Sequence, residues 1–244
     1  MKRFLILQLR PETDAADDEF AAILDKCNLT PDRAHRVRLD CQPLPSDLDV
    51  TDYAGIIVGG GPGCVSDAPE VKSEMDAQIE AQIMALMPQI TERDHPFMGC
   101  CYGLGILTHH LGGVVSKARY GEPVGPSDCS LTAEAADDPL TTGLPDQFQA
   151  LVGHKEAVQT LPPGCTHLIQ SAPCPIQMIR YGTNVYATQF HPEADAQDFE
   201  RRIHIYRNHG YFPPEQAEEL VNTCHAAQVT VPGEILRRFA KRYG

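Results

Sequence analysis

The residues best suited to chemistry lie at positions 99–103, where an apolar run ends in Gly-Cys-Cys-Tyr-Gly and a helical pattern follows. This Gly-x-Cys-x-Gly spacing is that of a nucleophile elbow with cysteine in the serine position. A strand that turns sharply into a helix strains its corner residue and brings neighbouring backbones close, which favours flanking glycines. The corner side chain then lies at a helix N-terminus, where the dipole favours a thiolate. We therefore predict that Cys101 is a catalytic nucleophile and that Cys100 is buried at the end of the strand.

A cysteine nucleophile needs a base and a group that orients the base. Among the ten histidines, His191 has the best context, because it ends an apolar strand-like segment and is followed by Pro192 and Glu193. Residues i and i+2 of an extended segment point to the same side, so Glu193 can lie beside the imidazole. The pattern predicts that His191 is the base and that Glu193 holds it.

Donors for a developing oxyanion are expected from backbone N–H groups. One is the N–H of Tyr102, directly after the predicted nucleophile, and another comes from the glycine-rich turn Gly59–Gly63. This turn follows an inner strand, and sites in open α/β sheets lie at such strand ends. A phosphate-binding loop is the competing interpretation, but neither the Gly-x-Gly-x-x-Gly spacing nor the Walker spacing is present.

The first half of the chain alternates between strand and helix patterns, which positions these residues at the ends of parallel strands. Apolar runs predict strands over 4–9, 35–39, 54–58 and 96–100. One helix is expected to be capped by Thr13. A longer one is expected to be capped by Asp67, with an apolar stripe that starts at Val71 and Met75. We predict an α/β fold with an open, mainly parallel central sheet, flanking helices and a nucleophile elbow.

The second half of the chain lacks helical periodicity between its strand-like pieces. These pieces predict antiparallel strands added to the sheet, over 114–115, 130–132, 148–152, 167–170, 176–180 and 185–190. Two or three helices are expected to follow them. Because no linker or repeat divides the chain, we predict one domain over residues 1–244, in which 195–244 form a helical C-terminal extension.

Composition excludes several classes of function. The formal net charge is −13, and an acidic chain without a basic stripe is a poor candidate for binding nucleic acid or an anionic membrane. No apolar stretch is long enough to span a membrane or resembles a secretory signal. Nine irregularly spaced cysteines without a Cys-x-x-Cys pair favour free thiols in a reducing cytoplasm. We expect a cytoplasmic protein without a metal or a cofactor.

Three motifs, in this order and at these separations, resemble the class I glutamine amidotransferases, in particular the amidotransferase part of GMP synthases. They are Gly-Gly-Gly-Pro at 59–62, Gly-Cys-Cys-Tyr-Gly at 99–103 and Gln-Phe-His-Pro-Glu at 189–193. The resemblance covers residues from about 54 to 193. It implies attack on the side-chain amide of glutamine, which yields a γ-glutamyl thioester and ammonia, and then hydrolysis of the thioester to glutamate.

The resemblance also implies roles for individual residues. It implies a catalytic triad of Cys101, His191 and Glu193 and an oxyanion hole near Gly60 and Tyr102. Further residues are implied to lie at the substrate, namely Gly59, Gly61, Gly105 and His154.

Two sites at or beside these substrate positions depart from the pattern of the family. Gly105 stands where the family usually has a glutamine that helps to form the glutamine pocket. The tetrapeptide at 153–156, Gly-His-Lys-Glu, stands where the family often has Ser-His-Gly-Asp. Both departures fall where the substrate would be held.

We therefore predict a glutamine amidotransferase-like hydrolase that acts on a small molecule. A GMP synthase would continue into a synthetase domain, so either the partner is a separate, ammonia-accepting synthetase subunit or the chain is a free-standing hydrolase. Because of Gly105, hydrolysis of another γ-glutamyl amide, such as a γ-glutamyl peptide, stays open as a second hypothesis. A catalytically silent module that binds a partner or a small amide is the alternative from a different class.

Overall fold

The computed structural model describes residues 1–244, and most of its strands join one large sheet. The strands are β1 (Phe4–Gln8), β2 (Ala34–Arg38), β3 (Gly55–Val58), β4 (Phe97–Cys100), β5 (Val115–Ser116), β6 (Glu122–Leu131), β7 (Gln147–His154), β8 (Ala157–Val158), β9 (Cys165–Ser171), β10 (Met178–Tyr181) and β11 (Val185–Thr188). The α-helices are α1 (Thr13–Cys27), α2 (Glu74–Glu92), α3 (Tyr102–His110), α4 (Ala196–Tyr206), α5 (Ala217–Ala226) and α6 (Val231–Tyr243).

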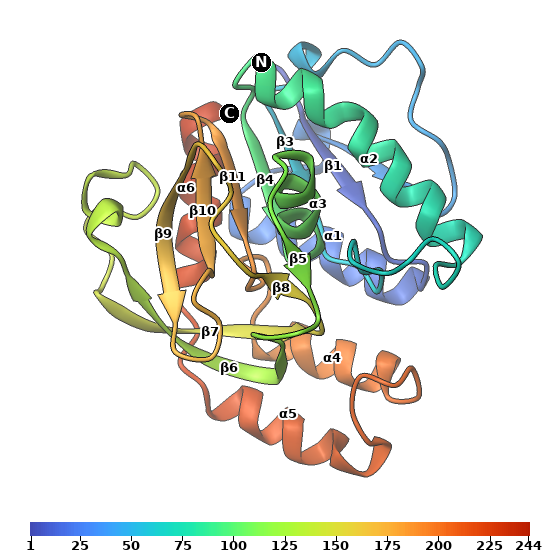
Figure 1. Cartoon of the computed structure of the whole chain (residues 1–244), viewed down its shortest axis with the longest axis vertical. Coiled ribbons are helices and arrows are strands. Elements are labelled where there is room, and N and C mark those ends of the chain that lie inside the picture. The colour runs from blue at the N-terminus through green and yellow to red at the C-terminus, as the bar shows by residue number, and fades with distance from the viewer.

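The large sheet has nine strands in the order β2-β1-β3-β4-β11-β10-β9-β6-β7, and β5 pairs with β8 separately (Figure 1). The strands from β2 to β11 in this order pair in parallel. The strands from β11 to β7 pair antiparallel. This arrangement confirms the predicted α/β class, with a parallel set, flanking helices and antiparallel strands from the second half of the chain.

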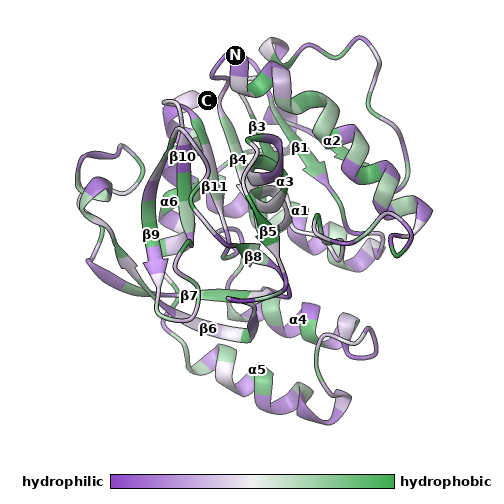
Figure 2. Ribbon diagram, viewed as in Figure 1, coloured by the Kyte–Doolittle hydropathy of each residue, from purple (hydrophilic) through white to green (hydrophobic).

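The parallel strands are buried on both faces, which explains their continuous apolar sequences. All five residues of β1 are buried, and their side chains alternate between the two layers. Leu5 and Leu7 pack in the core that α2 and α3 cover, whereas Phe4 and Ile6 pack in the core that α6 covers. Figure 1 shows α3 in front of the sheet and α6 behind it, and Figure 2 shows hydrophobic residues along the inner strands.

The two predicted helix caps in the first half are wrong. The N-cap of α1 is Glu12, one residue before Thr13, and no side chain caps this helix. The helix predicted to start after Asp67 begins at Glu74, because the Ser73 side chain accepts a hydrogen bond from the Asp76 N–H and satisfies an orphan donor. Val71 therefore precedes the helix and is 73% exposed, so it does not belong to the apolar stripe.

The antiparallel strands differ from the prediction in two ways. β6 is ten residues long, although its sequence contains Pro123 and Pro126. The prolines are tolerated because β6 pairs with β9 only over residues 129–131 and its register with β7 shifts between Glu122 and Gly125. The last strand, β11, pairs in parallel with β4, with Thr188 opposite Cys100. This register brings the residue that follows each strand to the same edge of the sheet.

The C-terminal helices complete two different parts of the molecule. α6 packs on α1, whereas α4 packs on α5 and on α1. α4 begins with a capping box between Asp195 and Asp198, and its Phe199 ring lies 5.6 Å from the ring of His191. α4 therefore reaches the edge of the sheet where β4 and β11 end. No helix combines the length with the apolar character that crossing a bilayer requires.

Candidate active site

The corner between β4 and α3 has the strained geometry that the sequence predicts. Cys101 has φ 52° and ψ −94°, a conformation that non-glycine residues rarely adopt. Its N–H donates to the carbonyl oxygen of Thr188 at 2.7 Å, which ties the corner to β11. Cys100 is fully buried, as predicted.

Of the two glycines around the corner, Gly99 is the one that packing requires. A Cβ at Gly99 would lie 2.9 Å from the carbonyl carbon of Gly103 and 2.9 Å from the ring of Phe97. A Cβ at Gly103 would meet nothing closer than 3.6 Å. The close approach of α3 to β4 therefore depends on the glycine before the corner.

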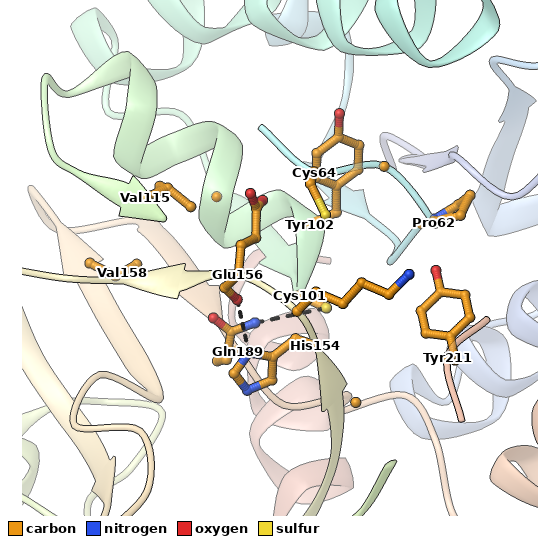
Figure 3. Close-up of a pocket in the computed structure, with 15 residues that line it drawn as sticks. Pro62, Cys64, Cys101, Tyr102, Val115, His154, Glu156, Val158, Gln189 and Tyr211 are labelled. Carbon is orange, nitrogen blue, oxygen red and sulfur yellow. Dashed lines mark hydrogen bonds between the residues drawn. The ribbon is translucent and has the colours of Figure 1, made fainter. Parts of the chain in front are cut away.

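The environment of the Cys101 thiol favours its neutral form. Burial raises the pKa of the thiol to about 12, although the nearby Arg10 guanidinium opposes this shift. A helix dipole typically contributes about 0.3–1 kcal/mol, less than the ~1.4 kcal/mol of one pKa unit. Desolvation therefore outweighs the effect of the dipole, which favours a thiolate. The Gln189 side-chain amide donates to the Cys101 sulfur at 3.8 Å (Figure 3).

His191 and Glu193 form the pair that the spacing predicts. His191 Nδ1 lies 2.8 Å from Glu193 Oε1, and both residues are buried. The same carboxylate oxygen accepts a hydrogen bond from Arg202 Nη1 at 2.9 Å. With Nδ1–H donating to Glu193, Nε2 of the neutral ring is left to accept a proton.

Charges around this pair keep the carboxylate ionised and the imidazole neutral. Burial alone would raise the pKa of Glu193, but His191 and Arg202 hold that pKa well below its usual range. Burial lowers the pKa of His191; Glu193 opposes this shift, whereas Arg202 and Arg10 add to it. A neutral thiol thus lies near a neutral imidazole that is ready to accept its proton.

The two predicted oxyanion donors lie at the ends of β3 and β4. Tyr102 is the first residue of α3, so its N–H has no acceptor within the helix. The N–H of Gly60, after β3, makes no hydrogen bond to a backbone carbonyl. A Cβ at Gly60 would lie 2.6 Å from Cε1 of His191 and 2.9 Å from Nη2 of Arg10. The absence of a side chain here lets both groups approach the turn.

Two cavities meet at Cys101. The first, which we call the Glu156 cavity, has a volume of about 430 Å³, and its polar wall includes Cys64, Tyr102, Lys155, Glu156 and Gln189 (Figure 3). The second, which we call the α4 cavity, has a volume of about 490 Å³, and its wall includes Arg10, His191 and side chains of α4. Four residues line both cavities: Gly61, Cys101, Gly153 and Tyr211.

Gly105, a predicted substrate residue, lies close to Glu156. The Glu156 carboxylate accepts hydrogen bonds from the N–H groups of Val65 and Ser66, each at 2.9 Å. A Cβ at Gly105 would lie 3.1 Å from Glu156 Oε1. The glycine at 105 therefore leaves space that the carboxylate of Glu156 occupies, and the two departures from the family pattern form one structural unit.

Two other predicted substrate residues have different surroundings. The ring of His154 contacts the carbonyl oxygen of Glu156 and the carboxylate of Glu122, each at 2.9 Å, so both of its nitrogens are occupied. Gly59 lines neither cavity, and a Cβ on it would meet the carboxylate of Glu19 at 2.3 Å. Gly61, Gly105 and His154 do line the Glu156 cavity.

Glu122, His154 and Cys174 lie close enough together to reach one metal ion. The Glu122 carboxylate already accepts hydrogen bonds from Ser127 and Gln177, each at 2.6 Å, in addition to its contact with His154. These contacts satisfy the carboxylate with protein donors. We therefore interpret this group as a buried network that holds His154.

Sequence reasoning did not assign four side chains that the structure brings to the site. Arg10 follows β1, so the rule that sites lie at strand ends could have found it. Gln189 and Glu156 stand in or beside quoted motifs. Arg202 had no sequence signal, because it reaches His191 and Glu193 from a helix outside the motifs.

Comparison with known proteins gives a consistent result. The model of the family described as glutamine amidotransferase class-I matches residues 32–211. A glutamine-hydrolyzing GMP synthase from Thermomicrobium roseum is 33% identical over 170 residues, which are 66% of this chain and 28% of that protein. One subunit of the glutamine-hydrolyzing GMP synthase from Thermoplasma acidophilum is 28% identical over 174 residues, which are 70% of this chain and 78% of that protein. The chain thus spans about a quarter of the length of GMP synthases such as the Thermomicrobium roseum protein.

Solved structures share the fold. A glutamine amidotransferase from Thermotoga maritima superposes with a TM-score of 0.76 at 20% identity, over 100% of this chain and 99% of that one. A glutamine amidotransferase from Methylobacillus flagellatus superposes with a TM-score of 0.71 at 17% identity, over 100% and 96% of the two chains.

Proposed function

The chain belongs to the class-I glutamine amidotransferase family, and from this premise we propose that it hydrolyses the side-chain amide of glutamine through Cys101, His191 and Glu193. One observation carries the proposal. The strained Cys101 and the imidazole that Glu193 holds open onto the same cavity. A silent binding module would not need a strained cysteine beside a buried, oriented histidine.

The proposed reaction begins with a neutral cysteine–histidine pair. As the Cys101 sulfur attacks the amide carbon, the thiol proton passes to Nε2 of His191, and Glu193 stabilises the imidazolium. The N–H groups of Gly60 and Tyr102 donate to the developing oxyanion. His191 then returns the proton to the departing nitrogen, leaving a γ-glutamyl thioester. A water molecule that His191 deprotonates releases glutamate and restores the thiol.

We place the glutamyl part of the substrate in the Glu156 cavity. A glutamyl group carries an α-ammonium and an α-carboxylate, and this cavity presents Glu156 and Lys155. The carboxylate of Glu156 has lone pairs beyond the two that accept the backbone N–H groups. Lys155 Nζ lies 4.3 Å from the centre of the Tyr211 ring, at the boundary of the two cavities. Opposite charges of the substrate and the wall therefore match.

The acceptor of the ammonia is a second part of the proposal. A synthetase-type partner is supported by the similarity to the Thermoplasma acidophilum protein, which is named as one subunit of a GMP synthase and of which this chain covers 78%. With such a partner present, we expect glutaminase activity to rise and free ammonia to fall. An unchanged rate and full ammonia release with every synthetase tested would contradict this part and leave the hydrolase proposal intact.

The direct test measures ammonia and glutamate released from L-glutamine by the purified chain. The wild type should release both in equal amounts, and added hydroxylamine should trap the thioester as γ-glutamyl hydroxamate. Cys101→Ala should abolish release. Cys100→Ala, which removes the neighbouring buried thiol, is the matched control and should keep the activity. Failure of the wild type to hydrolyse glutamine, or activity in C101A, would refute the proposal.

A further inference from the structure

We infer that the α4 cavity binds the leaving group of a larger substrate, and that the site therefore also cleaves γ-glutamyl peptides whose C-terminal residue is apolar. This inference rests on the proposed hydrolase function and extends it to the substrate class. Glutamine releases ammonia, which is too small and too polar to need the apolar wall of this cavity. Three features of the cavity indicate a larger leaving group.

The first feature is the position of the proton carrier. The nitrogen that departs must receive a proton from His191, so it must leave on the side of the imidazole. His191 lines the α4 cavity and does not line the Glu156 cavity. With the glutamyl part in the Glu156 cavity, the leaving amine extends into the α4 cavity.

The second feature is the apolar wall. Phe199, Ile203 and Tyr206 of α4 are buried, and their side chains line the cavity together with Val124 and Phe212. The ring of Tyr206 lies 5.6 Å from that of Tyr211, a residue that lines both cavities. Such a wall favours an aliphatic or aromatic side chain on the leaving group.

The third feature is an unused cationic donor. Arg10 is 6% exposed; its Nε donates to Glu19 at 2.8 Å and its Nη1 to the Tyr206 hydroxyl at 3.2 Å. Nη2 of Arg10 makes no hydrogen bond to another side chain or to a carbonyl, and it lies beside Gly60 at the edge of the cavity. A buried guanidinium N–H is a strong donor to a carboxylate. An amino acid leaving group supplies that carboxylate next to its amine.

The reaction consumes only the peptide and one water molecule. The sulfur of Cys101 forms a bond to the γ-carbonyl carbon, the amide C–N bond breaks, and the thiol proton reaches the departing nitrogen through His191. The free amino acid leaves from the α4 cavity. Water then cleaves the thioester, and the products are glutamate and one amino acid.

The experiment compares three substrates of the full chain: L-glutamine, γ-L-glutamyl-L-phenylalanine and the γ-glutamyl amide of phenethylamine, which lacks the carboxylate. We expect kcat/KM for the peptide to equal or exceed that for glutamine. It should exceed that for the phenethylamide by about tenfold or more, since a site built to bind a polar group discriminates against its absence. Arg10→Lys should reduce the ratio of kcat/KM for the peptide to kcat/KM for the phenethylamide.

A variant that fills the α4 cavity tests the inference independently of Arg10. Val124→Phe should lower the peptide-to-glutamine ratio of kcat/KM by about tenfold or more, because the added ring occupies the space of the leaving group. Val71→Phe, the same change at a valine that is 73% exposed and lines neither cavity, should leave the ratio unchanged.

The outcomes separate the two levels of proposal. Hydrolysis of glutamine without cleavage of the peptide would overturn the inference and keep the proposed function. An equal loss for both substrates in V124F would also overturn the inference, because the cavity would then have a structural role only. Hydrolysis of none of the three substrates would instead refute the proposed function.

Discussion

The two cavities at Cys101 differ in what builds them and in what they present. The Glu156 cavity is formed by segments that follow β3, β4 and β7, and its wall carries Glu156 and Lys155. The α4 cavity shares the strand ends but takes its wall from α4 and the loop after it, with aromatic rings and two arginines. The sheet edge thus carries the proposed reacting groups at the boundary of both cavities, whereas the element packed over each cavity sets the character of its wall.

The comparison also assigns different steps to the two sides. The proposed proton carrier, His191, and its partners Glu193 and Arg202 belong to the α4 side. On the Glu156 side, both nitrogens of His154 are occupied, and the Glu156 carboxylate is held by two backbone N–H groups. With glutamine as the substrate, substitutions of His191 and its partners should therefore change the rate of chemistry, and those on the Glu156 side should change substrate binding.

The largest effect is expected from removal of the proton carrier. His191→Asn should lower kcat about 10³-fold or more, since general acid–base catalysis contributes about 10²–10⁴-fold and the neutral thiol has no other acceptor. Glutamate release from saturating glutamine measures this change. His225→Asn, on the surface beside Glu200, is the control. An H191N enzyme with a tenth of the wild-type kcat would remove the proposed division between the sides.

An intermediate effect is expected on the other side. Glu156→Gln should raise KM for glutamine about 10- to 150-fold with kcat within a few fold, because a hydrogen bond to a charged group contributes about 1.5–3 kcal/mol. Steady-state kinetics with glutamine separates the two constants. The control is Glu134→Gln in an exposed turn. If E156Q lowered kcat and left KM unchanged, the α-ammonium would not bind at this carboxylate.

The smallest effect concerns the pH profile. His191 must be neutral to accept the thiol proton, and burial lowers its pKa, so kcat/KM should fall on the acid side with an apparent pKa below ~6.5. Arg202 adds to this lowering. Arg202→Met should therefore raise the His191 pKa and move the acid limb to higher pH by less than about one unit. If the acid limb of the kcat/KM profile stayed in place or moved to lower pH, Arg202 would not lower the pKa of His191.

The predicted elements differ in accuracy for physical reasons. The parallel strands were predicted to within one or two residues because burial on both faces produces continuous apolar runs. β6 was largely missed because its two prolines and its mixed pattern resemble a loop. The strand tolerates the prolines because it pairs with β9 only over residues 129–131 and its register with β7 shifts, which the sequence does not reveal. The start of α2 was misplaced because Ser73 and Asp67 are both capping types, and the hydrogen bond to Asp76 distinguishes them only once the helix is formed.

The sequence by itself determined the local parts of this protein. The elbow at Cys101, the His191–Glu193 spacing and the glycine turn after β3 each depend on a few adjacent residues, so their patterns are legible without the fold. Long-range packing decided the rest. The parallel pairing of β11 with β4 brings His191 to Cys101, burial makes the thiol neutral, and α4 supplies Arg202 and the wall of the second cavity. The pairing of β11 with β4 joins residues about 90 positions apart (188 and 100), and Arg202 reaches Glu193 from a separate helix, so no local pattern encodes these contacts.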